Sequence, residues 1–472
     1  MMQFDPFISA TALASALRNR ELSAPEVMTG YLERIQRLNP SINAFIWMDE
    51  QLAMDAARDS QKRLDSGANV RAFEGVPLPM KDFGKVRGNP DTMGSNAFGD
   101  ERATEDSLVT SLFRGAGFAL MGRTNTPELA ALTDTANQRY GVTRNPWNLE
   151  RSVAGSSGGA AAAVAAGLAP AAHASDGGGS IRMPASANGL VGLKPSRGRI
   201  PAEVEMWNYA TTEGVVTRTV EDTAAILDVL SPGDPLGWWP TRAPKHPFAA
   251  LLDNKPGSLR VGVLPLLGIG IPVDDDCVEA VNVTARALEA MGHRVVEVSP
   301  FLFEPETLGM FVEYVMATYS ALLAGDNAQA CEPFIQYKIA QADAFSSAQY
   351  VALLRSVQVQ AREVVAQWGH DFDVLLTPTM ATTLPRAGQV FEEANANPAG
   401  ERLLERRMAG FTLTASLSGL PAASFPVHTD REGLPVGIQL IGRPCDDATV
   451  LQLGRALERE FEWNARHPAS FL

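Results

Sequence analysis

Two glycine-rich segments joined by an alanine run limit what this 472-residue chain can fold into more than any other feature. The first segment, 155–159, leads into the alanines of 160–166, and the second holds three consecutive glycines at 177–179. Glycines permit tight turns, and alanines pack closely in a helix. Three adjacent glycines cost chain entropy, which indicates that a ligand or another backbone approaches their N–H groups. Such a loop suits an oxyanion hole; a phosphate-binding nest is the alternative, although no complete phosphate motif occurs.

Apolar periodicity elsewhere predicts strands that alternate with helices. A helix capped by Ser23 is expected to end at Asn39 and Pro40, and a strand-helix-strand crossover with parallel strands is expected over 259–298. This alternation favours an α/β sheet covered by helices on both faces. Further strands are expected at 372–377 and 436–441, and further helices at 51–64, 220–230, 306–323, 347–367 and 447–461.

The charge balance excludes several classes of partner. With 54 acidic and 40 basic residues the net charge is −14, so the average surface potential repels nucleic acids. The longest apolar stretch, 160–172, is shorter than the roughly 20 residues of a membrane span, and 1–15 lacks a basic and apolar leader. We therefore expect neither membrane insertion nor a signal peptide.

The spacing of cysteines and histidines predicts no disulfide framework, no metal site and no cofactor. The three cysteines form no C-x-x-C pair, and the six histidines show no H-E-x-x-H spacing. An odd number of widely spaced cysteines fits a reducing compartment, so we expect a cytoplasmic protein. The cysteines are Cys277, Cys331 and Cys445.

Lys81 and the serines of the first glycine segment each allow two interpretations. Lys81 follows an apolar stretch punctuated by prolines, so it is either an exposed lysine at a strand end or a desolvated amine whose lowered pKa lets it act as a base. Ser156 and Ser157 either cap the alanine helix or take part in chemistry at its positive end. Neither feature decides the matter by itself.

Taken together, Lys81, 155–159 and 176–184 resemble the signature of the amidase signature family of serine hydrolases in both content and spacing. The resemblance covers essentially the whole chain, because other segments follow the family's order as well. These segments are 122–128, 144–148, 192–196 and 435–444.

The resemblance implies a Ser-cis-Ser-Lys triad. Ser180 would be the nucleophile, Ser156 the bridging serine on a cis peptide, and Lys81 the ultimate base. A serine hydroxyl is a weak nucleophile, and a buried neutral lysine reached through a second hydroxyl can accept its proton. Ser156 would then protonate the departing amine, and water would cleave the acyl-enzyme.

The residues around the triad receive supporting roles from the same resemblance. Ser157 is expected to hydrogen-bond Lys81, and Asp176 and Arg182 are expected to shape the glycine loop. The oxyanion would be held by the main-chain N–H groups of Gly177, Gly178, Gly179 and Ser180.

The substrate pocket is expected near small residues. Ala130 and Ala131 stand where the family lines its acyl pocket, which predicts room for bulky or aromatic groups. Trp207 and Tyr209 are expected to form another wall. Gly177 stands where the family more often has threonine or isoleucine, which predicts a more flexible oxyanion hole.

The resemblance also implies the architecture: a single compact α/β fold with a large central mixed β-sheet. Residues 1–70 would be an N-terminal helical region packed on a catalytic domain, 71–472. That domain would consist of a signature core at about 71–220, a more variable substrate-side region at about 231–370, and a return to the core at about 371–472.

The predicted function is a stand-alone, cofactor-free amidohydrolase that acts on a small-molecule amide. Aryl amides are the substrate hypothesis, and esters or carbamates (urethanes) would share the same acyl chemistry. Three alternatives stand beside it: an α/β-hydrolase elbow with Ser157 as nucleophile, the glutamine-hydrolysing subunit of a tRNA-dependent amidotransferase, and a non-enzymatic binding protein. The sequence leaves a homodimer open.

Overall fold

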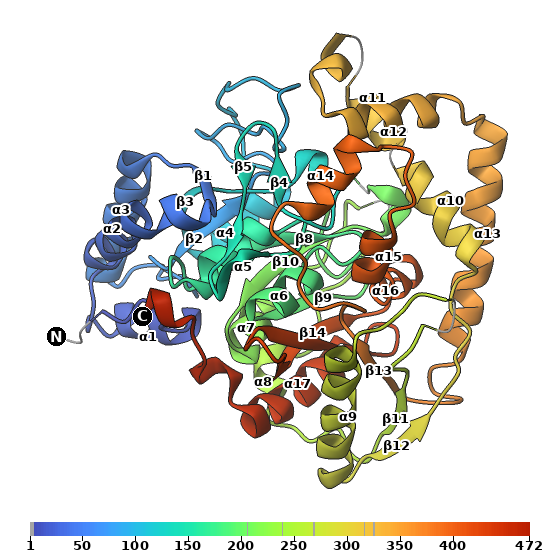
Figure 1. Ribbon diagram of the computed structural model, residues 1–472. Coiled ribbons are helices and arrows are strands. Elements are labelled where there is room, and N and C mark those ends of the chain that lie inside the picture. Colours follow the sequence, from blue (N-terminus) through green and yellow to red (C-terminus); the bar gives the residue numbers. More distant parts are fainter. Residues whose placement is uncertain (1–3, 205, 238, 268–269, 316, 324–325) are drawn as a thin grey trace.

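The computed structural model describes residues 4–472 apart from 205, 238, 268–269, 316 and 324–325 (Figure 1). Its centre is an eight-stranded sheet with the order β12-β11-β13-β15-β14-β9-β10-β8. β11 runs parallel to β12 and to β13, and the other neighbours are antiparallel, so the sheet is mixed as expected. The strands are β8 (Ala171–Asp176), β9 (Val191–Lys194), β10 (Thr212–Thr217), β11 (Arg260–Val263), β12 (Arg294–Glu297), β13 (Val374–Pro378), β14 (Ala422–Thr429) and β15 (Pro435–Ile441).

Helices cover both faces of this sheet, which confirms the predicted α/β architecture (Figure 1). Successive side chains of a strand point to opposite faces. In β14, Phe425 packs in the apolar cluster that contains α7 (Val220–Leu230), α9 (Asp275–Ala290) and α17 (Asp447–Phe461). Ala422 packs in a different cluster together with α16 (Leu413–Ser418). The predicted crossover is also confirmed, since α9 connects β11 to the parallel β12.

A second, three-stranded sheet carries the N-terminal part of the chain. Its order is β1 (Phe45–Trp47), β3 (Ala119–Thr124) and β2 (Pro77–Lys81), and β2 runs parallel to β3. The C-terminal end of β2 packs against β8 of the large sheet. This contact brings Lys81 to the edge where the triple-glycine loop begins.

The helix that begins after Ser23 ends later than predicted. α2 spans Ala24–Ile42, so Pro40 lies within its last turn. A proline removes only its own N–H from the helical ladder, and other groups close this end. The Asn43 N–H donates to the Asn39 carbonyl (2.7 Å), and the Asn39 side chain accepts from the N–H groups of Ala44 (2.9 Å) and Phe45 (2.8 Å).

The remaining helices and short strands surround the two sheets, and several of the helices form a separate helical region on the right of Figure 1. The predicted helix at 347–367 is α13, and the helix predicted over 306–323 is two helices, α10 and α11, with residue 316 outside the described residues. The helices are α1 (Ala10–Arg18), α3 (Glu50–Ser66), α4 (Leu108–Ala116), α5 (Gly158–Ala165), α6 (Arg182–Asn188), α8 (Phe248–Leu251), α10 (Pro305–Val315), α11 (Ala317–Leu322), α12 (Pro333–Asp343), α13 (Ser347–Ala366), α14 (Gln389–Ala396) and α15 (Leu403–Ala409). The short strands are β4 (Ala136–Asn137), β5 (Gly141–Val142), β6 (Arg144–Asn145) and β7 (Asn148–Ser152), and the 3₁₀ turns are η1 (Glu128–Ala130), η2 (Trp207–Tyr209), η3 (Asp326–Ala330), η4 (Trp463–Ala465) and η5 (Ala469–Phe471).

The C-terminal tail lies against the N-terminal helices. The Arg34 guanidinium in α2 donates to the Phe471 carbonyl (2.7 Å), and the Phe7 ring stacks on His467 with 4.2 Å between ring centroids. Within the described part of the chain, no helix is both long and apolar enough to cross a membrane. Cys277, Cys331 and Cys445 are free thiols, of which the first two are buried.

Candidate active site

Three segments that are far apart in the sequence meet where β2 packs against β8. Lys81 is the last residue of β2, Ser156 lies just before α5, and Ser180 lies between β8 and α6. The alanine helix can come this close because its first residues have no side chains: a Cβ at Gly159 would lie 2.4 Å from the Asn125 backbone nitrogen. The glycine-alanine pattern therefore serves backbone packing beside the site.

Lys81 is fully buried, so the interpretation as an exposed lysine is wrong. Its Nζ donates to Ser156 Oγ at 2.7 Å and to Ser175 Oγ at 3.0 Å. Burial lowers the pKa of Lys81 to about 7, although the negative charges of Glu213 and Asp176 oppose this shift. A substantial fraction of this amine is therefore neutral near pH 7 and able to accept a proton.

Ser156 follows a cis peptide bond, as the sequence resemblance implied. Its side chain is buried beside Lys81 and reaches the same cavity as Ser180. The structure therefore brings Lys81, Ser156 and Ser180 into one site.

The expected hydrogen bond from Ser157 to Lys81 is not formed. Ser157 Oγ instead donates to the Ser175 carbonyl (3.2 Å) and accepts from the Ser175 N–H (3.3 Å). Ser175, which sequence reasoning missed, supplies the second hydroxyl to Lys81. The alternation of side chains along β8 could have indicated this role, because Ser175 directly precedes Asp176 and its side chain lies on the opposite face of the strand.

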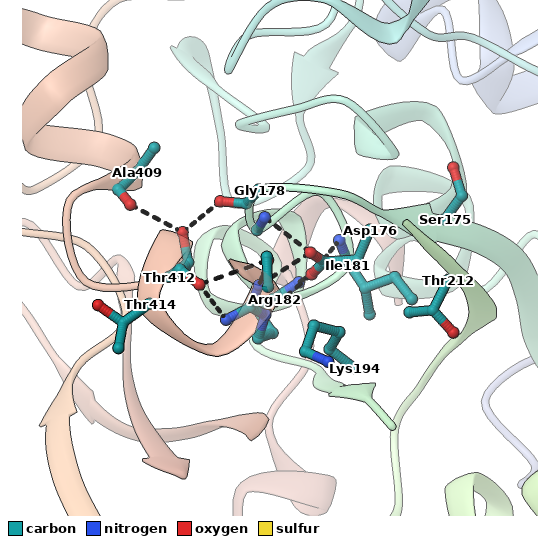
Figure 2. A network of polar contacts seen from close by, with 12 residues as sticks. Ser175, Asp176, Gly178, Ile181, Arg182, Lys194, Thr212, Ala409, Thr412 and Thr414 are labelled. Atoms are coloured by element: carbon teal, nitrogen blue, oxygen red, sulfur yellow. Dashed lines mark hydrogen bonds and ion pairs between the residues drawn. The ribbon is translucent and has the colours of Figure 1, made fainter. Parts of the chain in front are cut away.

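Asp176 organises the glycine loop, as Figure 2 shows. Its carboxylate accepts from the N–H groups of Gly179 (2.7 Å) and Ile181 (3.1 Å) and pairs with Arg182 at 2.8 Å, with both charged side chains fully buried. Burial disfavours the charged form of Asp176, but the Arg182 guanidinium outweighs it and holds the pKa of Asp176 below its usual value.

Arg182 ties this loop to the C-terminal part of the chain. Its guanidinium donates to the Thr412 carbonyl (2.8 Å) and to Gln439 Oε1 (2.6 Å), and the Thr412 hydroxyl donates to the Gly178 carbonyl (2.5 Å; Figure 2). The loop is therefore held from both sides by buried polar groups, and these contacts argue against the greater flexibility that was predicted from Gly177.

The predicted set of oxyanion donors needs one correction. The Gly179 N–H is engaged by Asp176 and is unavailable to a ligand. Within the described residues, the N–H groups of Gly177, Gly178 and Ser180 have no hydrogen-bond partner. Gly177 is buried and the other two residues are half-buried beside the cavity, and a buried N–H group is normally paired, so these three groups mark a place for an acceptor.

A cavity of about 70 Å³ lies over the loop and includes Ser156, Ser175, Gly177 and Ser180 in its wall. The Trp207 ring covers Gly177 so closely that a Cβ there would lie 2.4 Å from it. Gly177 is therefore required sterically beneath the indole. The other lining residues are mainly apolar and include Phe83, Ala130, Ile200, Met206 and Trp207.

Two of the four predicted pocket residues line this cavity. Ala130 and Trp207 do, whereas Ala131 packs in the neighbouring apolar cluster and Tyr209 packs near Trp239 with 6.4 Å between ring centroids.

Two segments beside the same cavity contain strained backbone. Leu129, Ala130, Trp207 and Tyr209 all have φ values in the left-handed region, between 52° and 66°. Non-glycine residues seldom adopt this conformation, at a cost of about 1–3 kcal/mol each, and such residues cluster at functional sites. The strain marks both walls of the cavity as specialised segments.

The described residues contain no group of three or more His, Cys, Asp or Glu side chains arranged to hold a metal ion.

The comparisons with known proteins agree with this geometry. The family model described as Amidase matches residues 26–451. The 6-aminohexanoate-cyclic-dimer hydrolase of Pseudomonas sp. (strain NK87) is 34% identical over 99% of this chain and 98% of its own length.

Two solved structures share the whole fold. One is 6-aminohexanoate cyclic dimer hydrolase complexed with substrate, with a TM-score of 0.90 and 32% identity over 99% of this chain and 100% of that one. The other is a bacterial aryl acylamidase of the amidase signature family, with a TM-score of 0.88 and 27% identity over 97% of both chains. The expected family and fold are thereby confirmed: this protein belongs to the amidase signature family and is an amidase.

Proposed function

We propose that the protein hydrolyses the C–N bond of small-molecule carboxylic amides through an acyl-enzyme on Ser180. The observation that carries the proposal is the buried Lys81 amine, 2.7 Å from Ser156 Oγ, in a cavity that Ser180 also lines. A hydroxyl becomes a useful nucleophile when a base of matched pKa can take its proton, and Lys81 has that pKa.

In the proposed first step, Ser180 Oγ attacks the amide carbonyl carbon. Its proton passes to Ser156 Oγ, while the Ser156 proton passes to Lys81 Nζ. No hydrogen bond joins Ser180 to Ser156 in this structure, and such contacts commonly tighten only when substrate is bound. The negative charge that develops on the carbonyl oxygen is stabilised by the unpaired N–H groups of Gly177, Gly178 and Ser180.

In the second step the carbon–nitrogen bond breaks. Ser156 gives a proton to the departing amine and recovers one from Lys81, which matters because an unprotonated amide nitrogen is a poor leaving group. Water then attacks the acyl-enzyme carbonyl and gives its proton to Ser156 and Lys81. The relay returns this proton to Ser180 Oγ as the acyl–oxygen bond breaks and the carboxylic acid is released.

The position of Ser157 supports Ser180 over the elbow alternative. The Ser157 hydroxyl is fully buried and hydrogen-bonded to the Ser175 backbone, whereas Ser180 is partly exposed and lines the cavity. A nucleophile must reach the substrate, so Ser180 is the better candidate.

The substrate proposal starts from the small side chain of Ala130, which lines the cavity together with the aromatic rings of Phe83 and Trp207. Aryl amides are therefore the first candidates. Esters and carbamates, including urethanes, are expected to react at the same oxyanion site, and the cyclic dimer of 6-aminohexanoate is a candidate because relatives are named for its hydrolysis. A stand-alone, cytoplasmic amidase is proposed, without nucleic-acid or membrane partners.

The experiment is a substrate profile of the wild type and Ser180→Ala. It covers anilides, short aliphatic amides, esters, carbamates, the cyclic dimer and glutamine. We expect the wild type to hydrolyse amides and the variant to lose turnover of all of them. Aliphatic amides turned over as well as anilides would refute the aryl preference. Turnover of glutamine alone would favour the amidotransferase subunit, and no turnover of any amide would refute the proposal.

A further inference from the structure

A carboxylate stands in the wall of the active-site cavity. Glu213 lies on β10 directly opposite Ser175 of β8, so the two side chains share one face of the sheet. Its side chain lines the cavity and is 25% exposed. Glu213 therefore sits above the hydroxyl that Lys81 contacts, although the proposed reaction does not use it.

His173 holds this carboxylate in place. It lies two residues before Ser175 on the same face, and its Nε2 is 2.8 Å from Glu213 Oε2. The ring is fully buried, and its Nδ1 has no hydrogen-bond partner among the described residues. The contact between the two side chains orients the Glu213 carboxylate in the cavity wall.

The described lining of the cavity contains no lysine or arginine, and Lys81, the basic group that Glu213 acts on, is neutral in the form that accepts a proton. Asp176 is the other acidic residue in the described lining, and it is paired with Arg182. Phe83 also lines the cavity, and its ring centroid is 5.7 Å from Lys81 Nζ. The ring therefore lies at the end of the cavity where Lys81 is found. A carboxylate and an aromatic ring in the wall of one cavity each attract a cation.

The position of Glu213 also indicates which half of the substrate the cation belongs to. Ser156 delivers the proton to the departing nitrogen in the proposed reaction, and Lys81 bonds to both Ser156 and Ser175. Glu213 stands opposite Ser175, which contacts the same amine as Ser156. In the proposed reaction this relay of Lys81 and Ser156 serves the departing amine.

We infer that Glu213 and Phe83 form a subsite for a cationic group on the amine half of the substrate, so that amides of diamines and similar amines with an ammonium group are preferred. The inference rests on the proposed function and adds the substrate class to it.

The test compares two amides that differ only in this charge: N-(4-aminobutyl)benzamide and N-pentylbenzamide, in which a methyl group replaces the ammonium. We expect the wild type to favour the ammonium substrate in kcat/KM by about tenfold, and Glu213→Gln to lose that preference. The ratio of the two substrates on one variant cancels any effect of Glu213 on Lys81. Glu203→Gln, which removes an exposed carboxylate outside the described lining, is the matched control and should keep the preference.

A second measurement needs neither substrate turnover nor a folded Glu213 variant. Pentylammonium and 1-pentanol are compared as protectants of the wild-type Ser180 against a fluorophosphonate, and the ammonium should protect at an about tenfold lower concentration. Equal protection, a wild-type preference for the neutral amide, or an unchanged preference in Glu213→Gln would each overturn the inference. Failure of the proposed function has a different signature, which is fluorophosphonate labelling that survives Ser180→Ala.

Discussion

The Lys81 amine and the Ser156 hydroxyl form a buried hydrogen bond of 2.7 Å that joins the end of β2 to the loop before α5. The two residues meet because β2 packs against β8 and because the glycines around residue 156 let the backbones come close together. The pH dependence expected of the enzyme follows from this pair.

Lys81 must be neutral to accept a proton, and its pKa is about 7. Activity should therefore rise as the pH increases through about 7 and level off above it. Lys81→Ala should lose most amide hydrolysis, with partial recovery at high pH for substrates with good leaving groups, because hydroxide replaces the base. A pH profile of kcat/KM checks this. Near-normal amide turnover by Lys81→Ala would exclude Lys81 as the base.

Ser175 is expected to set the protonation of Lys81 as well as its position. Ser175→Ala removes a hydrogen bond that favours the charged amine, so the acidic limb of the pH profile should move to lower pH. A fall in kcat of about tenfold is expected from looser positioning. Ser157→Ala is the control, since its hydroxyl bonds only to the backbone and its loss should leave the limb in place. If the acidic limb of the pH profile stays at the same pH in Ser175→Ala, this role of Ser175 is contradicted.

Asp176→Asn should act mainly on stability. It leaves the fully buried Arg182 without its counter-charge, which typically costs about 3–5 kcal/mol. Thermal unfolding should show a large fall in Tm. Glu432→Gln breaks an ion pair at the surface with Arg151, which is worth at most about 1 kcal/mol, and provides the comparison. A large fall in kcat for Asp176→Asn at unchanged Tm would argue against a structural role.

Gly177 and Trp207 should behave as a coupled pair. Gly177→Ala places a methyl group 2.4 Å from the indole, which must shift and disturb the cavity, so kcat/KM should fall by about tenfold or more. Trp207→Ala should relieve that clash and restore part of the activity in the double variant. Additive losses in the double-mutant cycle would mean that the contact does not limit activity.

Sequence patterns predicted helices accurately where local signals in the sequence define both ends of the helix. α7 and α17 have the predicted bounds, because an N-cap and an amphipathic repeat define each of them. The predicted end of α2 was wrong. Asn39 and Asn43 close the helix beyond Pro40 through hydrogen bonds that cannot be anticipated from the position of the proline alone.

The candidate site was predictable in its residues and less so in its contacts. The resemblance located Lys81, Ser156 and Ser180, but the choice of Ser175 over Ser157 depends on how β8 packs against β2. The exclusion of Gly179 as a donor depends on the position of one carboxylate oxygen of Asp176. Such details depend on tertiary geometry, which spacing alone does not encode.

Intact-mass analysis after reaction with a fluorophosphonate, on the wild type, Ser180→Ala and Ser157→Ala, decides whether Ser180 is the nucleophile. We expect one adduct on the wild type and on Ser157→Ala, and none on Ser180→Ala. Labelling that persists in Ser180→Ala and disappears in Ser157→Ala would contradict this expectation.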